Sequence, residues 1–306
     1  MRAVIQTRFG GPEVLEVVQA ETPRPTTGEV LVRVRASGLN PVESAVRSGD
    51  FPLLGEPPFA LGWDVSGVVE QAGPETGFAV GDEVFGLPFF PAQAAGYAEY
   101  VVAPADQIVR KPAGIDHVHA AALPLAALTA WQALDRAGVG PGHTVLIQRA
   151  AGGVGHLAVQ LAKVRGAEVI ALASAGKHEF VRGLGADRLI DYQTTDFTEA
   201  VRGVDVVLDS TQQTERSLAV LRPGGTVVTI LEHRDEALAA RVRAAGFRFV
   251  GIGVEPDGPA LKEIADLAGA GRLRPYVAET FPLAEVAKAH ELLDGGQVQG
   301  KIVLTV

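Results

Sequence analysis

The fold of this chain is decided by Thr144-Val-Leu-Ile-Gln-Arg-Ala-Ala-Gly-Gly-Val-Gly155, followed by His156-Leu-Ala-Val-Gln-Leu-Ala-Lys163. The short aliphatic run from Val145 to Ile147 predicts a buried strand, and the apolar residues at helical spacing after the glycines predict a helix. A glycine-rich turn between a strand and a helix brings the backbone close to a pyrophosphate, whose charge faces the free N–H groups of the helix start. The pattern G-x-G-x-x-G is met imperfectly, because Ala150 takes its first place while Gly152 and Gly155 fill the others. Such turns also join strands and helices that bind nothing, so the surrounding sequence has to show whether this turn binds a ligand.

The segment after Thr144 alternates strands with helices, which is typical of a parallel sheet covered by helices on both faces. The expected strands lie at 145–147, 168–172, 188–190, 204–208, 225–230 and 247–251, and the expected helices at about 154–164, 177–184, 196–200, 213–221 and 234–244. The fold class predicted from this pattern is α/β, with a doubly wound parallel sheet.

Residues 1–120 differ from this segment, because short strands there are separated by glycines and prolines. The strand-like stretches are Val14–Val18, Val30–Arg35, Val65–Val69, Glu83–Phe85 and Ala98–Val102. We expect a short helix at Pro41–Arg47 and an Ala/Leu-rich helix at Ala120–Leu134. The tail resembles the first part in its pattern, so we expect it to fold back there. The predicted limits are a β-rich domain of residues 1–122, completed by 268–306, and a second domain of residues 123–267.

Composition narrows the classes of function. The chain has 306 residues, a net charge of −9 and no cysteine. A negative chain lacks the basic stripe of a nucleic-acid surface, and the missing cysteines exclude disulfides, thiolate catalysis and cysteine-ligated zinc. No stretch supplies the ~18 uninterrupted apolar residues of a membrane span, and the sequence from Met1 shows no signal-type segment. We therefore expect a cytoplasmic protein that binds neither nucleic acid nor a membrane.

A series of motifs runs from one end of the chain to the other. They are Ala36-Ser-Gly-Leu-Asn-Pro-Val-Glu43, Leu61-Gly-Trp-Asp-Val-Ser-Gly-Val-Val69, Val80-Gly-Asp-Glu-Val-Phe-Gly86, Gly96-Tyr-Ala-Glu-Tyr100, Leu123-Pro-Leu-Ala-Ala-Leu-Thr-Ala-Trp131, Ala150-Ala-Gly-Gly-Val-Gly155, Leu221-Arg-Pro-Gly-Gly225 and Gly300-Lys-Ile-Val-Leu304. In this order they resemble the medium-chain dehydrogenase/reductase superfamily, and within it the zinc-independent quinone oxidoreductase branch, the zeta-crystallin-like enzymes. The resemblance implies a GroES-like β-rich catalytic domain, a Rossmann domain and a cofactor cleft between them.

The chain departs from the zinc-dependent relatives at their metal ligands. Those enzymes use a cysteine and a histidine at places that here match Asn40 and Trp63. An amide and an indole N–H cannot replace a thiolate and an imidazole on Zn²⁺, so we expect no metal. His117 and His119 are a weak alternative, because two imidazoles alone do not make a zinc site.

The nicotinamide cofactor can be inferred from the strand that follows the glycine turn. A site for NAD usually carries an acidic residue ~20 positions after the turn, to bind the ribose 2′-hydroxyl. Here Ser174 holds that position, whereas Glu168 is at the opposite end of the strand. The resemblance implies that Ser174, Lys177 and Tyr192 bind the 2′-phosphate of NADP(H), which a carboxylate would repel. The alternative is that Lys177 is a solvated first-turn lysine and Tyr192 an aromatic at the sheet edge.

Further site residues follow from the resemblance. The cofactor-binding set is Asn40, Thr129, Gly152, Gly153, Val154, Ser174, Lys177, Tyr192, Leu231, Ile252 and Gly253. Asn40 and Trp63 are the candidate catalytic residues: Asn40 would orient the nicotinamide or the substrate carbonyl, unless it only forms a turn before Pro41. Trp63, together with Phe51, Phe59 and Phe89, would either line a flat acceptor site or belong to the core. For Glu43 we favour a salt bridge to Arg47 at i+4 over a role in proton relay.

We expect an NADPH-dependent reductase of quinones or α,β-unsaturated carbonyl compounds. Two alternatives stay open: an enoyl-thioester reductase of the same superfamily, and a non-catalytic NADPH-binding or redox-sensing protein. The family usually dimerises by pairing sheet edges, so we expect a homodimer, with Phe247–Val254 as the candidate edge.

Overall fold

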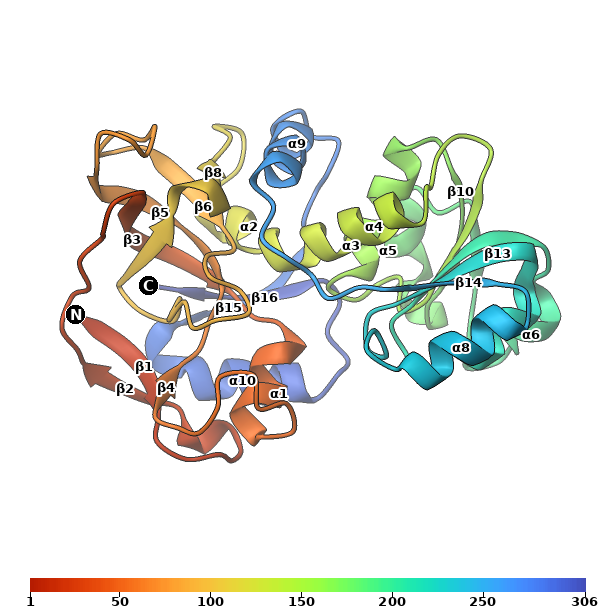
Figure 1. The fold of residues 1–306 in the computed structure, drawn as a ribbon, viewed down its shortest axis with the longest axis horizontal. Coiled ribbons are helices and arrows are strands. Elements are labelled where there is room, and N and C mark those ends of the chain that lie inside the picture. Colours follow the sequence, from red (N-terminus) through yellow and green to blue (C-terminus); the bar gives the residue numbers. More distant parts are fainter. The chain divides into compact units, whose positions relative to one another are not determined.

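The computed structural model describes all residues from 1 to 306 and divides them into two compact units (Figure 1). Unit 1 comprises Met1–Leu128 and Glu255–Val306, and unit 2 comprises Thr129–Val254. The limits expected from sequence, 122 and 267, followed changes in composition. The contacts instead assign residues 255–267 to unit 1, because helix α9 (Gly258–Gly269) packs on strand β8 (Ile108–Arg110).

Unit 2 is built on a six-stranded sheet in which every pairing is parallel. Its strands are β9 (Thr144–Ile147), β10 (Glu168–Leu172), β11 (Arg188–Ile190), β12 (Val204–Asp209), β13 (Leu221–Thr229) and β14 (Arg248–Gly251). The spatial order is β11-β10-β9-β12-β13-β14, so the order reverses between β9 and β12. This is the doubly wound Rossmann topology, in which ligands bind beyond the carboxyl ends of the strands at the point of reversal. The α/β fold predicted from sequence is confirmed.

The helices of unit 2 bury an aliphatic core against this sheet. They are α4 (Gly155–Val164), α5 (His178–Gly183), α6 (Phe197–Ala200), α7 (Thr214–Ser217) and α8 (Glu236–Ala244). Leu146 and Val207 of two neighbouring strands belong to the same buried cluster as Leu238 and Val242 of α8. Each fully buried side chain of this size stabilises the fold by roughly 1.5–3 kcal/mol. The cap of α8 is an aspartate, Asp235, whose carboxylate accepts the N–H of Leu238.

Unit 1 contains a seven-stranded sheet and a smaller three-stranded one. The large sheet has the order β15-β16-β3-β5-β6-β8, with β7 also pairing with β3, and the small sheet has the order β2-β1-β4. Their strands are β1 (Arg2–Gln6), β2 (Glu16–Gln19), β3 (Glu29–Gly38), β4 (Phe59–Ala60), β5 (Asp64–Ala72), β6 (Glu83–Gly86), β7 (Tyr100–Pro104), β8, β15 (Val277–Pro282) and β16 (Lys301–Thr305). The last strand, β16, pairs antiparallel with β3, so the C-terminal segment completes the large sheet of the N-terminal part.

The remaining helices show one departure from the sequence analysis. They are α1 (Pro41–Ser48), α2 (His117–Ala121), α3 (Pro124–Arg136), α9 and α10 (Val286–Asp294). The helix expected at Ala120–Leu134 is observed from Pro124 to Arg136, with Pro124 at its first position, but Ala120 and Ala121 belong to the separate helix α2. Proline has no N–H to donate and disfavours helical backbone in the residue before it, so it starts a helix rather than continuing one. None of the helices combines the length and the apolar character that crossing a membrane requires.

Candidate functional site

The glycine turn of unit 2 joins β9 to α4 and is closely packed. The N–H of Ala150 donates to the carbonyl of Leu172 at 3.0 Å, which fixes the turn against the end of β10. A Cβ at Gly155 would lie 2.2 Å from the carbonyl oxygen of Arg149 and 2.8 Å from the Cα of Ala150. Only glycine fits there, because both neighbours are backbone. A Cβ at Gly152 would meet the same carbonyl at 3.2 Å. The turn therefore has the close helix–strand approach that a pyrophosphate cradle needs.

The three residues predicted to bind a 2′-phosphate follow neighbouring strands. Ser174 comes directly after β10 and accepts the N–H of Lys177 through its backbone carbonyl at 2.9 Å. Tyr192, whose exposed fraction is 54%, follows β11, and β11 pairs with β10 through Leu172 and Ile190. All three lie at the carboxyl edge of the sheet.

No carboxylate follows β10 at this edge. Glu168 pairs with Thr144 at the opposite end of the strands, as the sequence indicated. Burial, and then the positive charge of Arg149, lower the pKa of the Lys177 ammonium from its usual value. Two basic side chains, Arg149 and Lys177, therefore lie close enough near the end of β10 to act on each other.

The residues predicted near the nicotinamide end lie beyond β13 and β14. Leu231 is 53% exposed, whereas Ile252 is buried and donates its N–H to the carbonyl of Thr229. A Cβ at Gly253 would contact the ring of His233 at 3.4 Å. The sequence analysis missed His233, whose Nδ1 donates to the carbonyl of Ile230, because one histidine in a loop carries no pattern. Thr129 is buried within helix α3, at the start of unit 2.

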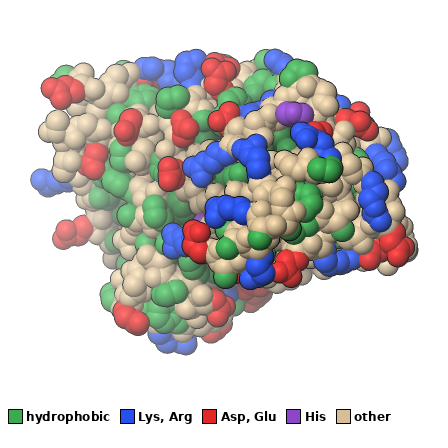
Figure 2. Space-filling view, turned by 45° about the vertical axis from the view of Figure 1, so that its right-hand side comes forward, with side chains coloured by type: hydrophobic (Ala, Val, Ile, Leu, Met, Phe, Trp, Pro, Cys, Tyr) green, Lys and Arg blue, Asp and Glu red, His purple; other side chains and the backbone are tan.

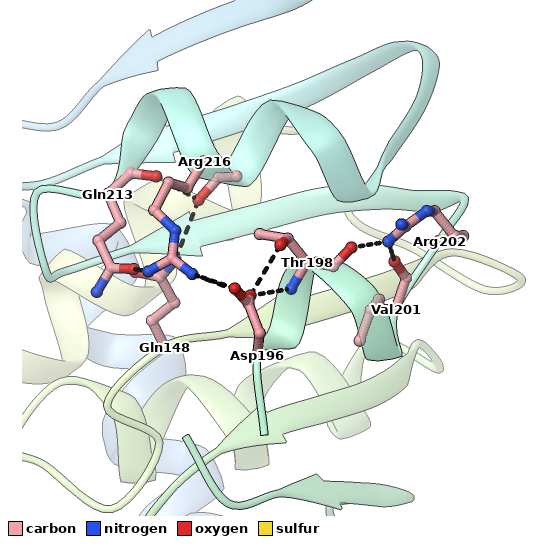
Figure 3. A network of polar contacts seen from close by, with 8 residues as sticks. Gln148, Asp196, Thr198, Val201, Arg202, Gln213 and Arg216 are labelled. Carbon is pink, nitrogen blue, oxygen red and sulfur yellow. Dashed lines mark hydrogen bonds and ion pairs between the residues drawn. The ribbon is translucent and has the colours of Figure 1, made fainter. Parts of the chain in front are cut away.

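The loop after β12 lies at the point where the strand order reverses, and buried polar contacts hold it. The carboxylate of Asp209, fully buried, accepts from the N–H groups of Thr211 and Gln213 at 2.7 and 2.9 Å. Figure 3 shows the continuation of this network: Arg216 donates to Gln213 and to both carboxylate oxygens of Asp196. The charge of Arg216 is therefore already matched, and its function is to hold the loop.

Unit 1 contains a second polar cluster, which we call the Asn40 network: Asn40, Glu43, Asp64 and Lys301. These residues come from the cap of α1, its first turn, the start of β5 and the start of β16. Their exposed fractions are 2%, 0%, 0% and 3%, so water is excluded from all of them. Lys301 Nζ contacts Asn40 Oδ1 and lies 3.2 Å from Asp64 Oδ2. Asp64 Oδ1 also accepts the N–H of Leu125 at 2.7 Å.

The amide of Asn40 is fully engaged within this network. Its Nδ2 donates to Asp64 at 3.0 Å and to Glu43 at 3.3 Å, while its Oδ1 accepts from Lys301. An Asn side chain has two N–H donors, and both have acceptors here. Asn40 therefore links the other three members of the network, in addition to capping α1.

The predicted salt bridge between Glu43 and Arg47 is wrong. Glu43 accepts the backbone N–H of Asn40 at 2.9 Å and completes a capping box at the start of α1. Arg47 turns toward α10, where it donates to Asp294 at 2.7 Å and to His290 at 2.8 Å. Glu43 and Arg47 therefore pair elsewhere: Glu43 supplies the acceptor that the helix start needs, and Arg47 supplies the cation that the Asp294 carboxylate needs.

The surroundings of Glu43 raise its pKa from 4.5 to about 8. Burial is the largest cause and the charge of Asp64 the next, while Lys301 and the hydrogen bonds act in the opposite direction. A carboxyl whose pKa is raised on folding holds its proton more tightly in the folded protein. Its contribution to stability is present below about pH 4.5 and is lost as the pH rises through about 8.

Replacing Glu43 by glutamine is expected to remove this pH dependence, because the amide resembles the protonated carboxyl. The free energy of unfolding of E43Q should rise relative to wild type between pH 5 and 8, by up to roughly 1.4 kcal/mol per pH unit. Urea unfolding at several pH values measures the difference. Glu16→Gln, at an exposed position of β2, is the control. Parallel curves for E43Q and wild type would show that Glu43 is ionised when folded.

Two of the four candidate aromatic residues are interior. Trp63 is 1% exposed, donates its Nε1–H to the carbonyl of Ala92 at 2.7 Å and packs edge-on against Phe90. Phe59 is 5% exposed and contacts Phe9, whereas Phe51 and Phe89 are half-buried. Trp63 and Phe59 are therefore part of the core of unit 1.

The residues present do not fit a catalytic zinc. Asn40 and Trp63 hold protein acceptors through N–H groups, and His117 bonds Ser66 and Glu83. His119 bonds Asp116, the cap of α2. No group of three or more His, Cys, Asp or Glu side chains is arranged to hold a metal ion.

Comparisons with known proteins agree with this architecture. Residues 26–113 match the model of the alcohol dehydrogenase GroES-like domain, and residues 184–304 match that of a zinc-binding dehydrogenase family. A 2-methylene-furan-3-one reductase of Solanum lycopersicum is 36% identical, over 99% of this chain and 79% of its own length. An NADPH-dependent alkenal/one oxidoreductase of Arabidopsis thaliana has the same identity and coverage. The solved structure of a quinone oxidoreductase from Coxiella burnetii superposes with a TM-score of 0.95 at 37% identity, covering 100% of this chain and 99% of that one.

Proposed function

Because the chain belongs to the medium-chain dehydrogenase/reductase superfamily, in its quinone oxidoreductase branch, we propose that it is an NADPH-dependent reductase of quinones or α,β-unsaturated carbonyl compounds. One observation carries the proposal: a turn in which Gly155 admits no side chain stands beside the end of β10, where Ser174 takes the place of the acid that NAD sites carry. The names of the relatives, an alkenal/one oxidoreductase and a quinone oxidoreductase, support the acceptor class.

The residues of this chain would hold the cofactor through its charged groups. Gly152, Gly153 and Val154 would offer backbone N–H groups to the pyrophosphate, and Ser174, Lys177 and Tyr192 would bind the 2′-phosphate. Thr129, Leu231, Ile252 and Gly253 would contact the nicotinamide end. The bound cofactor supplies the hydride, and the protein supplies orientation and exclusion of water.

Quinones and enones suit the chemistry of these side chains better than alcohols do. Oxidising an alcohol requires a group that stabilises an alkoxide, and Asn40 and Trp63 do not fit the zinc that does so in relatives. Reduction of a quinone or enone spreads the developing charge onto a phenolate or enolate oxygen, for which one hydrogen-bond donor suffices. Asn40 and Trp63 give their N–H groups to protein acceptors, so we propose that they position their neighbours rather than donate to the acceptor.

Replacing Lys177 by alanine is expected to weaken NADPH binding by ~1.5–3 kcal/mol, the value of a hydrogen bond to a charged group. NADH lacks the 2′-phosphate, so its binding should barely change. Calorimetric titration of both cofactors measures the two dissociation constants. Equal weakening of NADPH and NADH binding would contradict the assignment of Lys177 to the 2′-phosphate.

The activity is tested by following NADPH oxidation with a panel of small quinones, enones and an enoyl thioester. We expect turnover of quinones or enones and faster turnover with NADPH than with NADH. Turnover of the thioester alone would favour an enoyl-thioester reductase. Tight NADPH binding without turnover of any acceptor would favour a redox-sensing protein.

We further propose a homodimer formed through β14. This strand is the last in the sheet order of unit 2, so its outer edge has no partner within the chain. Unpaired edge strands with apolar side chains are a common interface between identical subunits. Sedimentation equilibrium tests the proposal, and a stable monomer would contradict it.

A further inference from the structure

Arg149 has a backbone conformation that arginine rarely adopts. It lies two residues after the end of β9, and its φ of 47° falls in the left-handed region. This conformation costs an L-residue with a side chain roughly 1–2 kcal/mol, and glycine is the usual choice there. Such strain persists only where the surrounding structure imposes it, and it clusters at functional sites.

Arg149 is close enough to a second cation, Lys177, for its charge to act there. It is exposed, and its guanidinium has no hydrogen-bond or ion-pair partner within the chain. Its positive charge acts on Lys177 and disfavours the protonated ammonium. The bond from Ala150 to Leu172 explains the proximity, because it places the turn against the end of β10, which Ser174 and Lys177 follow.

Two nearby positive charges repel each other, and an anionic ligand that contacts both would relieve this repulsion. Arg216, on the other side of β9 in the strand order, shows the contrast, because Asp196 neutralises it through two bonds of 2.9 Å. The chain has a net charge of −9, yet lysine and arginine side chains gather near the middle of the face that Figure 2 shows. An excess of positive charge on an acidic protein suits an anionic ligand.

We propose that Arg149 and Lys177 together bind the 2′-phosphate of NADPH, and that Arg149 is a specificity-determining residue for this cofactor. This inference rests on the proposed function. A guanidinium binds phosphate oxygens through two parallel N–H bonds, whereas an ammonium contributes a point charge, so the two residues complement each other. Glycine, which this backbone conformation favours, would provide no charge at this position.

The test compares Arg149→Gln, Arg149→Gly and the control Arg243→Gln, an exposed arginine of α8. Dissociation constants are measured for NADPH and NADH, and for adenosine 2′,5′-bisphosphate against 5′-AMP. We expect R149Q and R149G to bind NADPH and the bisphosphate ~10–100-fold more weakly, the range for lost hydrogen bonds to a charged group. NADH and 5′-AMP should bind within about twofold of wild type, as should all ligands of R243Q.

The outcomes separate this inference from the proposed function. If the wild type prefers NADPH and R149Q keeps that preference, the role of Arg149 is overturned, while the proposed function still stands. If R149Q loses the preference for NADPH and R149G keeps it, the role of Arg149 is also overturned, because the charge is absent from both variants. Wild-type protein that binds NADPH no more tightly than NADH overturns the cofactor assignment and this inference with it.

Discussion

Replacing Lys301 by methionine is expected to destabilise unit 1 by about 3–5 kcal/mol, the cost of leaving a buried charge without its partner. The ammonium of Lys301 is the one cation of the Asn40 network, and it contacts both Asn40 and Asp64. The side chains of Lys301 and Asp64 are 3% and 0% exposed, so water cannot replace the lost contact. Methionine keeps most of the length of the side chain, which limits the effect of a cavity.

Urea unfolding of K301M, followed by circular dichroism, measures the change, and Lys262→Met is the matched control. Lys262 pairs with Asp266 at 2.9 Å, yet both side chains are more than 60% exposed. Removing an exposed pair of this kind should cost ~0.5 kcal/mol or less. The double variant Lys301→Met/Asp64→Asn should recover part of the loss, because it removes the unpaired carboxylate as well. Similar losses in K301M and K262M would show that the Asn40 network is hydrated rather than buried.

The fold of unit 2 could be predicted from sequence because its signals are local. A strand of four residues, a glycine turn and a helix stand next to one another, and the alternation of strands and helices continues to β14. The spacing of apolar residues within each element shows which of its faces is buried, so each element can be predicted separately. The sequence indicates the helix start at Pro124 but not the separate short helix α2, because the Ala/Leu pattern runs across the break.

The Asn40 network could not be predicted, because its members are distant in the chain. Lys301 and Asn40 are separated by 261 residues, and Gly300-Lys-Ile-Val-Leu304 reads as an ordinary strand. The salt bridge predicted between Glu43 and Arg47 failed for the same reason. The i+4 rule considers only partners on the same helix, whereas the partner of Arg47 is Asp294, on α10. A backbone torsion such as that of Arg149 also leaves no trace in the sequence.

Replacing Gly155 by alanine is expected to disrupt the turn itself. The added Cβ would lie 2.2 Å from the carbonyl oxygen of Arg149, and neither this atom nor the Cα of Ala150 can move independently of the turn. Overpacking of this kind costs about 1–3 kcal/mol of stability. Binding of both NADPH and NADH should weaken by on the order of 100-fold or more, because each lost hydrogen bond to the pyrophosphate contributes ~1.5–3 kcal/mol.

The control is Gly183→Ala in α5, where an added Cβ has nothing within 4 Å. This variant should gain ~0.5–1 kcal/mol, since alanine is the better helix former. The two cofactors also separate the roles at this edge of the sheet. G155A weakens the part of the binding that NADPH and NADH share, whereas K177A removes only the binding free energy that the 2′-phosphate contributes. If G155A bound both cofactors normally, the glycine turn would be a structural connection between β9 and α4, and the pyrophosphate would have to bind elsewhere.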